Sequence, residues 1–153
     1  MDAMSNLDIG KALCKYPYFL GVFSSDINPL PLIHSFPCCF VMNTKSRYMR
    51  SGGHWLAFYL ITPYSFEFFD SLGLSIQSYP AISTHFSNIN NIKYNKISLQ
   101  SSQSALCGDY CITFLSLRIS TNSFPASIHI IKSHSKGNSR ESFVRRFRLL
   151  NQK

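Results

Sequence analysis

Residues 52–73 read GGHWLAFYLITPYSFEFFDSLG, and this stretch decides the fold. Seven consecutive apolar residues at 55–61 are typical of a central strand that is buried on both faces of a sheet. The turn-forming sequence Thr-Pro-Tyr-Ser follows at 62–65, and the largely aromatic residues 66–69 then predict a strand that returns alongside the first. We therefore expect a hairpin at the centre of a sheet.

The segments on either side of this hairpin predict a mixture of helices and strands. Before it, the sequence predicts a short helix at 5–15 ended by Pro17 and Gly21, a loop at 23–37 and a buried strand at 38–43. After it, the sequence predicts a helix at 76–88 interrupted at Pro80, a strand at 93–99, a buried helix at 107–118 and a final helix at 139–150. This order, with no repeated strand–helix–strand unit, indicates an α+β protein.

The composition indicates a single globular domain. The chain has 153 residues, of which 45% are apolar and only 7 are Gly and 7 Pro, so it has enough apolar surface to form a core. Its longest uninterrupted apolar run is far shorter than the roughly 20 residues of a membrane helix. The N-terminal residues also lack the basic start and apolar stretch of a signal peptide. We expect a monomeric intracellular protein, in the nucleus or cytoplasm, that does not enter a membrane.

The positive charge is concentrated at the C-terminal end of the chain. The formal net charge is +8, and residues 118–153 contain eight Lys or Arg against one acidic residue. Such a segment predicts contact with a polyanion such as DNA. The candidate nucleic-acid-binding residues are Arg140, Arg145, Arg146 and Arg148. The alternative is that these arginines are only the solvated face of a helix. We predict that residues 119–153 are a basic extension that is partly helical.

Cys107 is the strongest candidate for a reactive side chain. The five cysteines are an odd number without a secretory signal, which favours free thiols over a disulfide framework. Cys107 opens the predicted helix at 107–118, so its thiol would lie near the positive end of the helix dipole, where the thiolate is favoured. Gly108 would let a substrate backbone approach closely. The alternative is that Cys107 is a small buried residue at the start of a core helix.

His54 and Asp70 are the candidates for a base and its carboxylate partner. His54 comes directly before the first strand of the hairpin, and Asp70 comes directly after the second. A hairpin that turns at 62–65 therefore places both residues at the same end of neighbouring strands. A histidine that accepts a proton from a thiol needs a carboxylate to orient its ring and to stabilise the imidazolium. The alternatives are a histidine that only starts a strand and an aspartate that only caps the following turn.

Gln100 is a candidate donor to a tetrahedral oxyanion. It lies seven residues before Cys107, in the polar loop that leads to the predicted helix. Its side-chain amide and the Cys107 backbone N–H would together stabilise the negative oxygen of an intermediate. Gln103 competes for this role, and Gln100 could also be an ordinary polar loop residue.

A zinc site is a further alternative. Its ligands would be Cys107, Cys111, His54 and His34. These residues lack the closely spaced ligand pairs that usually mark a zinc site in a sequence. We therefore predict no metal site.

Several of these motifs, taken in order, resemble one known family. They are the stretches PYFLGVF at 17–23, FVMNT at 40–44, GHWLAF at 53–58, FEFFDSLG at 66–73, Gln100 and ALCGDYC at 105–111. From Leu7 to Leu117 the chain resembles the adenovirus-type cysteine endopeptidases, including relatives that are encoded by large self-synthesising DNA transposons. It is more distantly similar to the proteases that process ubiquitin-like proteins.

The resemblance implies a papain-like fold, in which a central mixed sheet packs on a buried helix that begins at the catalytic cysteine. Residues 1–118 would form the protease domain. The implied roles are nucleophile for Cys107, general base for His54, orienting acid for Asp70 and oxyanion donor for Gln100. Trp55, Gly53 and Gly108 would contact the substrate.

The resemblance also implies a class of substrate. Members of this family typically cleave next to small residues, often Gly, which here would lie in capsid or polyprotein precursors of a virus-like element. No cofactor would be required, although DNA or a peptide can stimulate enzymes of this type. The alternative is a non-catalytic or degenerate protease-fold module that binds nucleic acid through its basic C-terminus.

The chain departs from the adenovirus pattern in three places. Adenovirus enzymes usually have Glu at the position of Asp70, although Asp is familiar in the wider group. No cysteine lies between Asp70 and Cys107, so the disulfide that adenovirus enzymes form there with an activating peptide is not expected. Residues 119–153 match no motif of the family.

Overall fold

A computed structural model of the chain describes residues 3–49 and 52–152 and confirms the α+β class. Its helices are α1 (Asn6–Leu13), α2 (Pro80–Ser83), α3 (Cys107–Thr121), α4 (Phe124–Ser133) and α5 (Asn138–Asn151). Its strands are β1 (Phe19–Phe23), β2 (Cys38–Asn43), β3 (Trp55–Thr62), β4 (Ser65–Phe69) and β5 (Asn91–Tyr94). Short 3-10 helices occur at Leu30–Leu32, Ile76–Ser78 and Thr84–Phe86.

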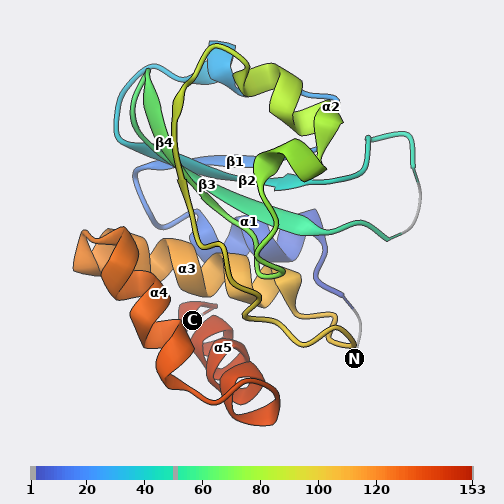
Figure 1. Cartoon of the computed structure of the whole chain (residues 1–153), viewed down its shortest axis with the longest axis vertical. Coiled ribbons are helices and arrows are strands. Elements are labelled where there is room, and N and C mark those ends of the chain that lie inside the picture. The colour runs from blue at the N-terminus through green and yellow to red at the C-terminus, as the bar shows by residue number, and fades with distance from the viewer. Residues whose placement is uncertain (1–2, 50–51, 153) are drawn as a thin grey trace.

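The five strands form one mixed sheet in the order β1-β2-β3-β4-β5. The outer pairs, β1 with β2 and β4 with β5, are parallel, whereas β2 with β3 and β3 with β4 are antiparallel. The predicted hairpin is therefore confirmed, with Thr62 of β3 opposite Ser65 of β4 at the turn. Strand β3 occupies the middle of the sheet (Figure 1).

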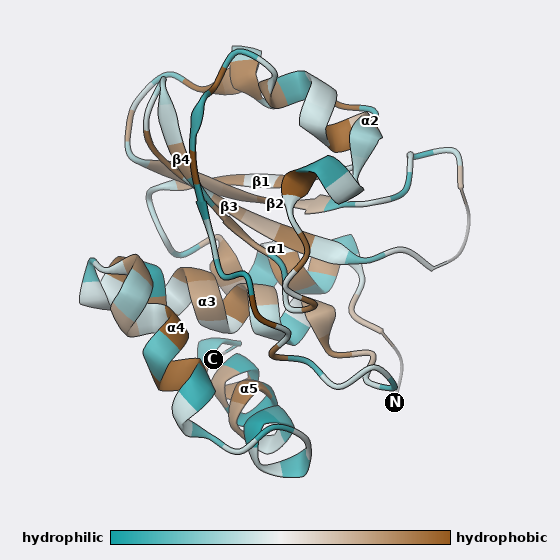
Figure 2. Cartoon of the chain, viewed as in Figure 1, coloured by the Kyte–Doolittle hydropathy of each residue, from teal (hydrophilic) through white to brown (hydrophobic). Residues whose placement is uncertain are grey.

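Alternation along β3 explains why its sequence is apolar throughout. Trp55, Ala57 and Tyr59 point into a core that the sheet shares with α1, α3, α4 and α5. The intervening Leu56, Phe58 and Leu60 point into a second core, which the segment around α2 covers on the opposite face. Figure 1 shows these two layers on either side of the sheet, and Figure 2 shows apolar residues concentrated in the strands and in α3. A strand that is buried on both faces needs apolar residues at every position.

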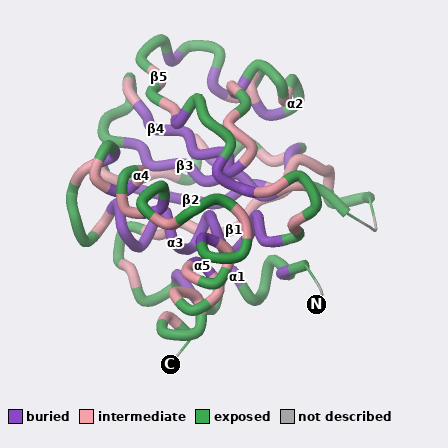
Figure 3. The backbone as a smooth tube through the Cα atoms, turned by 60° about the horizontal axis from the view of Figure 1, so that its bottom comes forward, coloured by how far each residue is buried: buried purple, intermediate pink, exposed green. Residues whose placement is uncertain are grey.

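Helix α3 is the buried centre of the helical layer. Every residue from Cys107 to Arg118 is buried, as the tube in Figure 3 shows along this helix. Helices α4 and α5 pack against α3, and their Ile131 and Val144 are fully buried in the same core. The boundary predicted at residue 118 lies within α3, so the two helices that follow it share the core of the preceding residues.

Two elements were not predicted from the sequence. Residues 19–23 form β1, whereas Pro17 and Gly21 had indicated a break in regular structure there. The strand forms because it pairs with β2 in parallel, and this pairing accommodates Gly21 at a shift in register. Helix α4 was not predicted either. Its Pro125 does not break the helix, because it lies in the first turn, where proline is well tolerated.

Three predicted segments also differ from the structure. The strand predicted at 93–99 is β5 at Asn91–Tyr94, and it ends before Lys96, whose φ of 52° is incompatible with a strand. The helix predicted at 76–88 is broken into two 3-10 segments and α2, and Pro80 starts α2 rather than interrupting it. The loop predicted at 23–37 contains one short 3-10 turn.

Within residues 3–49 and 52–152, the helices lack the length and apolar character that crossing a bilayer requires.

Candidate active site

The hairpin brings His54 and Asp70 into direct contact. The pairing of Ala57 with Phe69 places the residue before β3 and the residue after β4 at the same end of the sheet. His54 Nε2 lies 2.6 Å from Asp70 Oδ1, although the two residues are 16 positions apart. The backbone N–H of His54 also donates to Thr44 Oγ1 at 2.9 Å, which fixes the start of the strand. The structure therefore brings this predicted pair together.

Asp70 is fully buried and accepts three further hydrogen bonds. Its Oδ1 accepts the backbone N–H of Leu72 at 2.8 Å, and its Oδ2 accepts the backbone N–H of Leu74 at 3.3 Å and the hydroxyl of Tyr79 at 2.7 Å. A buried carboxylate needs such donors because burial removes its water. This turn therefore holds the Asp70 carboxylate against the imidazole.

Tyr79 and Asn95 support Asp70, and neither was predicted. Besides its bond to the carboxylate, the Tyr79 ring stacks beside the His54 ring with centroids 6.3 Å apart. Burial and then the bond to Asp70 raise the pKa of Tyr79, so its phenol stays protonated and remains a donor. Asn95 accepts the Asp70 backbone N–H at 3.1 Å and donates to the Asp70 carbonyl at 2.6 Å. Both residues lie in segments without a recognisable motif, so only the tertiary structure reveals them.

Cys107 completes this constellation from the first position of α3. The cysteine is 7% exposed and contributes to the wall of a surface cleft. The pKa of His54 is raised to about 9: burial alone would lower it, but interactions with Asp70 and with the Cys107 sulfur prevail. A histidine in this position carries a proton at neutral pH, and the helix dipole favours the matching negative charge on a thiol at the start of α3. The arrangement can hold a thiolate–imidazolium pair.

Gln100 is buried in the loop that precedes α3. Its Oε1 accepts the hydroxyl of Ser71 at 2.6 Å, which fixes the orientation of the amide. Its Nε2 donates to the Ser104 carbonyl and has a second N–H for another acceptor. Ser71 directly follows Asp70, so one turn positions both the carboxylate and the amide. Gln103, which competed for the donor role, is exposed.

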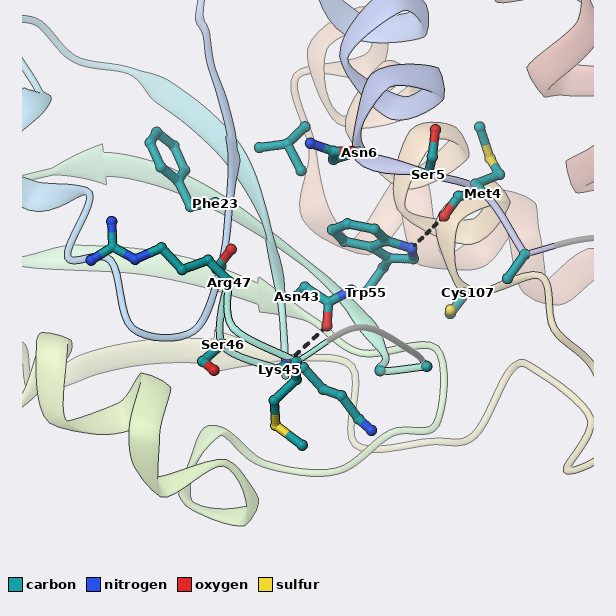
Figure 4. Close-up of a pocket in the computed structure, with 16 residues that line it drawn as sticks. Met4, Ser5, Asn6, Phe23, Asn43, Lys45, Ser46, Arg47, Trp55 and Cys107 are labelled. Atoms are coloured by element: carbon teal, nitrogen blue, oxygen red, sulfur yellow. Dashed lines mark hydrogen bonds between the residues drawn. The ribbon is translucent and has the colours of Figure 1, made fainter.

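Trp55 and Gly53, the predicted substrate contacts, line the same surface cleft as Cys107. Their contact with a substrate stays a prediction. The Trp55 indole N–H donates to the Met4 carbonyl at 3.1 Å, which ties the N-terminal segment to β3 (Figure 4). Gly53 has a φ of 105°, and a Cβ at this position would overlap the Asn43 side chain.

The structure corrects the role that was predicted for Gly108. This residue is buried, and a Cβ built on it would lie 3.0 Å from Met4 Cβ and 3.4 Å from Ile9 Cδ1. Its lack of a side chain therefore allows the N-terminal segment to pack against α3. A close approach does occur at Gly108, but it is made by the Met4 and Ile9 side chains of this chain and not by a substrate backbone.

A cleft of about 490 Å³ runs past the Cys107 sulfur (Figure 4). The cleft is lined by Trp55, Met4 and Gly53 together with Phe23, Lys45 and Arg47. Arg47 pairs with Asp26 at 2.9 Å. The cleft therefore combines apolar and small residues with positively charged ones.

The described residues contain no group of three or more His, Cys, Asp or Glu side chains that could hold a metal ion. The four residues of the zinc alternative, Cys107, Cys111, His54 and His34, are consequently not gathered into a site.

The C-terminal arginines do not form one surface. Arg140 is 6% exposed and donates to three backbone carbonyl groups, which corrects its predicted contact with nucleic acid, because a phosphate cannot reach it. Arg148 pairs with Asp109 of α3 at 3.3 Å. Arg145 is half-buried, and Arg146 is exposed. The excess of positive charge is thus partly used to attach α5 to the rest of the protein.

No protein-family model matches the chain, and no curated protein matches it. Two solved structures are similar along nearly its full length. The central domain of the uncharacterized protein Lpg1148 from Legionella pneumophila has a TM-score of 0.54 and 14% identity, covering 99% of this chain and 97% of that chain. ChlaDub1 from Chlamydia trachomatis has a TM-score of 0.59 and 12% identity, covering 99% and 93%. At these identities the likeness establishes a shared fold, and this fold includes the C-terminal helices α4 and α5.

Proposed function

We propose that this protein is a cysteine peptidase whose nucleophile is Cys107. One observation carries the proposal: His54 is paired with the buried Asp70, its pKa is raised, despite its burial, by interactions with Asp70 and with the Cys107 sulfur, and Cys107 opens α3 at the wall of a surface cleft. A base that is oriented by a carboxylate and a thiol at a helix N-terminus are the two requirements for thiolate attack on a carbonyl.

The two ring nitrogens of His54 have different roles. Nε2 contacts Asp70, which leaves Nδ1 to exchange a proton with the Cys107 thiol. The proton moves from sulfur to Nδ1, and the sulfur then attacks the substrate carbonyl carbon to form a tetrahedral intermediate. When the C–N bond breaks, His54 gives this proton to the leaving amine. Water then attacks the thioester, with His54 again accepting a proton, and the carboxylic acid and the free thiol are released.

Two donors are candidates for stabilising the oxyanion. The backbone N–H of Cys107 stands in the first turn of α3, where amide groups have no carbonyl partner within the helix. The Gln100 amide has one N–H beyond the one that it gives to Ser104. Preorganised donors of this kind stabilise an oxyanion without having to reorient during the reaction.

The cleft supports a peptide substrate with small residues at the scissile bond. Trp55, Met4 and Gly53 line the same cleft as Cys107, and an indole at this position favours a small side chain at the scissile bond. By its resemblance to the adenovirus-type enzymes, we propose an endopeptidase that cleaves next to Gly in capsid or polyprotein precursors of a virus-like element.

Peptide hydrolysis by matched variants tests this proposal. Wild-type protein, Cys107→Ala and Cys14→Ala would be compared on fluorogenic peptides that contain a Gly-Gly bond and on a Gly-free peptide. Cys14 is the control because it is an exposed free thiol at the end of α1. We expect turnover of the Gly-Gly peptides by wild type and Cys14→Ala, and none by Cys107→Ala. Equal turnover by wild type and Cys107→Ala would contradict the proposal, and folded protein without turnover would favour the non-catalytic alternative.

A further inference from the structure

Two adjacent residues of α5 hold the loop that carries Gln100. This loop runs from β5 to α3 and can be followed in Figure 1. Arg140 contacts the residue before Gln100, and Glu141 contacts the residue after it. Helix α5 follows the loop by about 40 positions, so this contact is created only by the tertiary fold.

Arg140 fixes the carbonyl group of Leu99. Its Nη1 donates to this carbonyl at 3.0 Å, and the hydroxyl of the fully buried Tyr110 donates to the same oxygen at 3.2 Å. The remaining donors of the guanidinium bind the carbonyl groups of His134 at 2.9 Å and Lys132 at 3.2 Å. The planar array of donors in arginine thus joins the loop, the end of α4 and the start of α5.

Glu141 holds the other side of Gln100. Its Oε1 accepts the hydroxyl of Ser101 at 2.6 Å. Ser101 in turn offers its carbonyl to the backbone N–H of Ser104 at 3.1 Å, and the Ser104 carbonyl accepts the Gln100 amide. Glu141 is therefore connected to the Gln100 side chain through two loop residues.

The turn after β4 provides a second set of contacts to the loop. The Ser71 carbonyl accepts the backbone N–H groups of both Leu99 and Gln100, at 2.8 and 2.9 Å. The Ser71 hydroxyl binds the Gln100 side chain directly. Gln100 therefore lies between an anchor on this turn and an anchor on α5, and a shift of either anchor would move its amide.

We infer that Arg140 and Glu141 are positioning residues for the oxyanion donor Gln100, so that α5 is part of the apparatus that supports catalysis. This inference rests on the proposed peptidase function. It gives the C-terminal segment a role in the rate of the reaction, because an oxyanion donor is effective only at the correct distance from the developing charge. Neither residue contacts the substrate in this account.

Comparing two reactions of Cys107 tests the inference. Acyl transfer passes through a tetrahedral oxyanion, whereas alkylation by iodoacetamide displaces iodide at carbon and forms none. A displaced Gln100 therefore slows peptide hydrolysis and leaves alkylation of Cys107 unchanged. A general loss of structure would instead alter both reactions and expose the buried thiols Cys38, Cys39 and Cys111 to the reagent.

The informative variants are Glu141→Ala and Ser101→Ala, which remove one hydrogen bond in a half-buried position. We expect kcat to fall about 5- to 20-fold in each with little change in KM, less than the roughly 100-fold fall expected for Gln100→Ala. The double variant should be no slower than the single ones, because both lose the same bond. Glu141→Gln keeps an acceptor and should recover most of the rate. Ser142→Ala, at an exposed neighbouring position of α5, is the control.

Arg140→Lys tests the stronger anchor. A lysine keeps the charge but cannot reach three carbonyl groups at once, so kcat should fall further than in Glu141→Ala while alkylation of Cys107 persists. If the wild type is active and kcat is unchanged in Glu141→Ala and Ser101→Ala, the inference is overturned and the proposed function stands. The same holds if hydrolysis and alkylation fall in parallel in these variants. A wild type without Cys107-dependent turnover overturns the proposed function together with the inference.

Discussion

The His54–Asp70 pair and the Gln100 loop belong to one site but are held in place differently. The pair is produced locally, because two neighbouring strands end side by side and Asp70 is enclosed by donors from its own turn. The loop has no strand or helix of its own at Gln100 and depends on Ser71 and on α5. The half that activates the thiol is therefore built by the hairpin, and the half that would stabilise the oxyanion is built by long-range contacts.

The largest effect is expected on the hairpin side. Asp70→Asn keeps the size of the side chain but removes the charge that stabilises the His54 imidazolium. We expect kcat to fall by about 1,000-fold, comparable in kind to the loss of the acid in other catalytic triads. Steady-state hydrolysis measures this effect. A fall below tenfold would show that the pair contributes far less than its geometry indicates.

Stability against pH provides a second measure of the same pair. The pKa of His54 rises from an ordinary 6.5 to about 9 in the folded protein, so its interactions stabilise the fold fully below pH 6.5 and are lost as the pH rises through 9. The contribution reaches up to about 3 kcal/mol. Thermal unfolding of wild type and His54→Ala should differ most near pH 6 and converge near pH 9.5. A difference that does not depend on pH would contradict the raised pKa.

On the loop side, Ser71→Ala should have an intermediate effect. The variant leaves Asp70 in place but frees the Gln100 amide to rotate, because its Oε1 loses the hydroxyl donor. We expect kcat to fall about tenfold, which corresponds to about 1.4 kcal/mol and lies within the range for the loss of one hydrogen bond. Alkylation of Cys107 should stay at the wild-type rate. If alkylation slows equally, the two halves of the site are not separable in the way proposed here.

The smallest effect is expected for Tyr79→Phe. The ring that stacks beside His54 is retained, and Asp70 loses one of its four donors. We expect kcat to fall about fivefold and the stability to drop by about 1 kcal/mol. Hydrolysis together with thermal unfolding at pH 7 measures both quantities. An effect as large as that of Asp70→Asn would mean that the hydroxyl, rather than the backbone donors, keeps Asp70 in place.

This contrast also explains how far the sequence allowed prediction. The hairpin and the contact between His54 and Asp70 follow from a continuous apolar run and a turn signal, which are local properties. The start of α3 at Cys107 follows from helical spacing after a polar loop. These features could be predicted because neighbouring residues in the chain determine them.

The remaining features depend on contacts between distant residues. Strand β1 was not predicted because Pro17 and Gly21 are typical of a break in regular structure, and residues 19–23 form a strand only through pairing with β2. Tyr79 and Asn95 support Asp70 from segments whose sequences carry no signal of this role. Arg140 was assigned to a basic surface because its charge is visible in the sequence, whereas the carbonyl groups that bind it are visible only in the fold.

The pH dependence of Cys107 alkylation reports on the proton exchange between His54 and Cys107. His54 is proposed to accept the Cys107 proton, so labelling by iodoacetamide should be faster at pH 6 in the wild type than in His54→Ala and should depend less steeply on pH. In His54→Ala the rate should be low at pH 6 and rise steeply with pH, as for an ordinary thiol. Profiles that coincide in the two proteins would contradict the account.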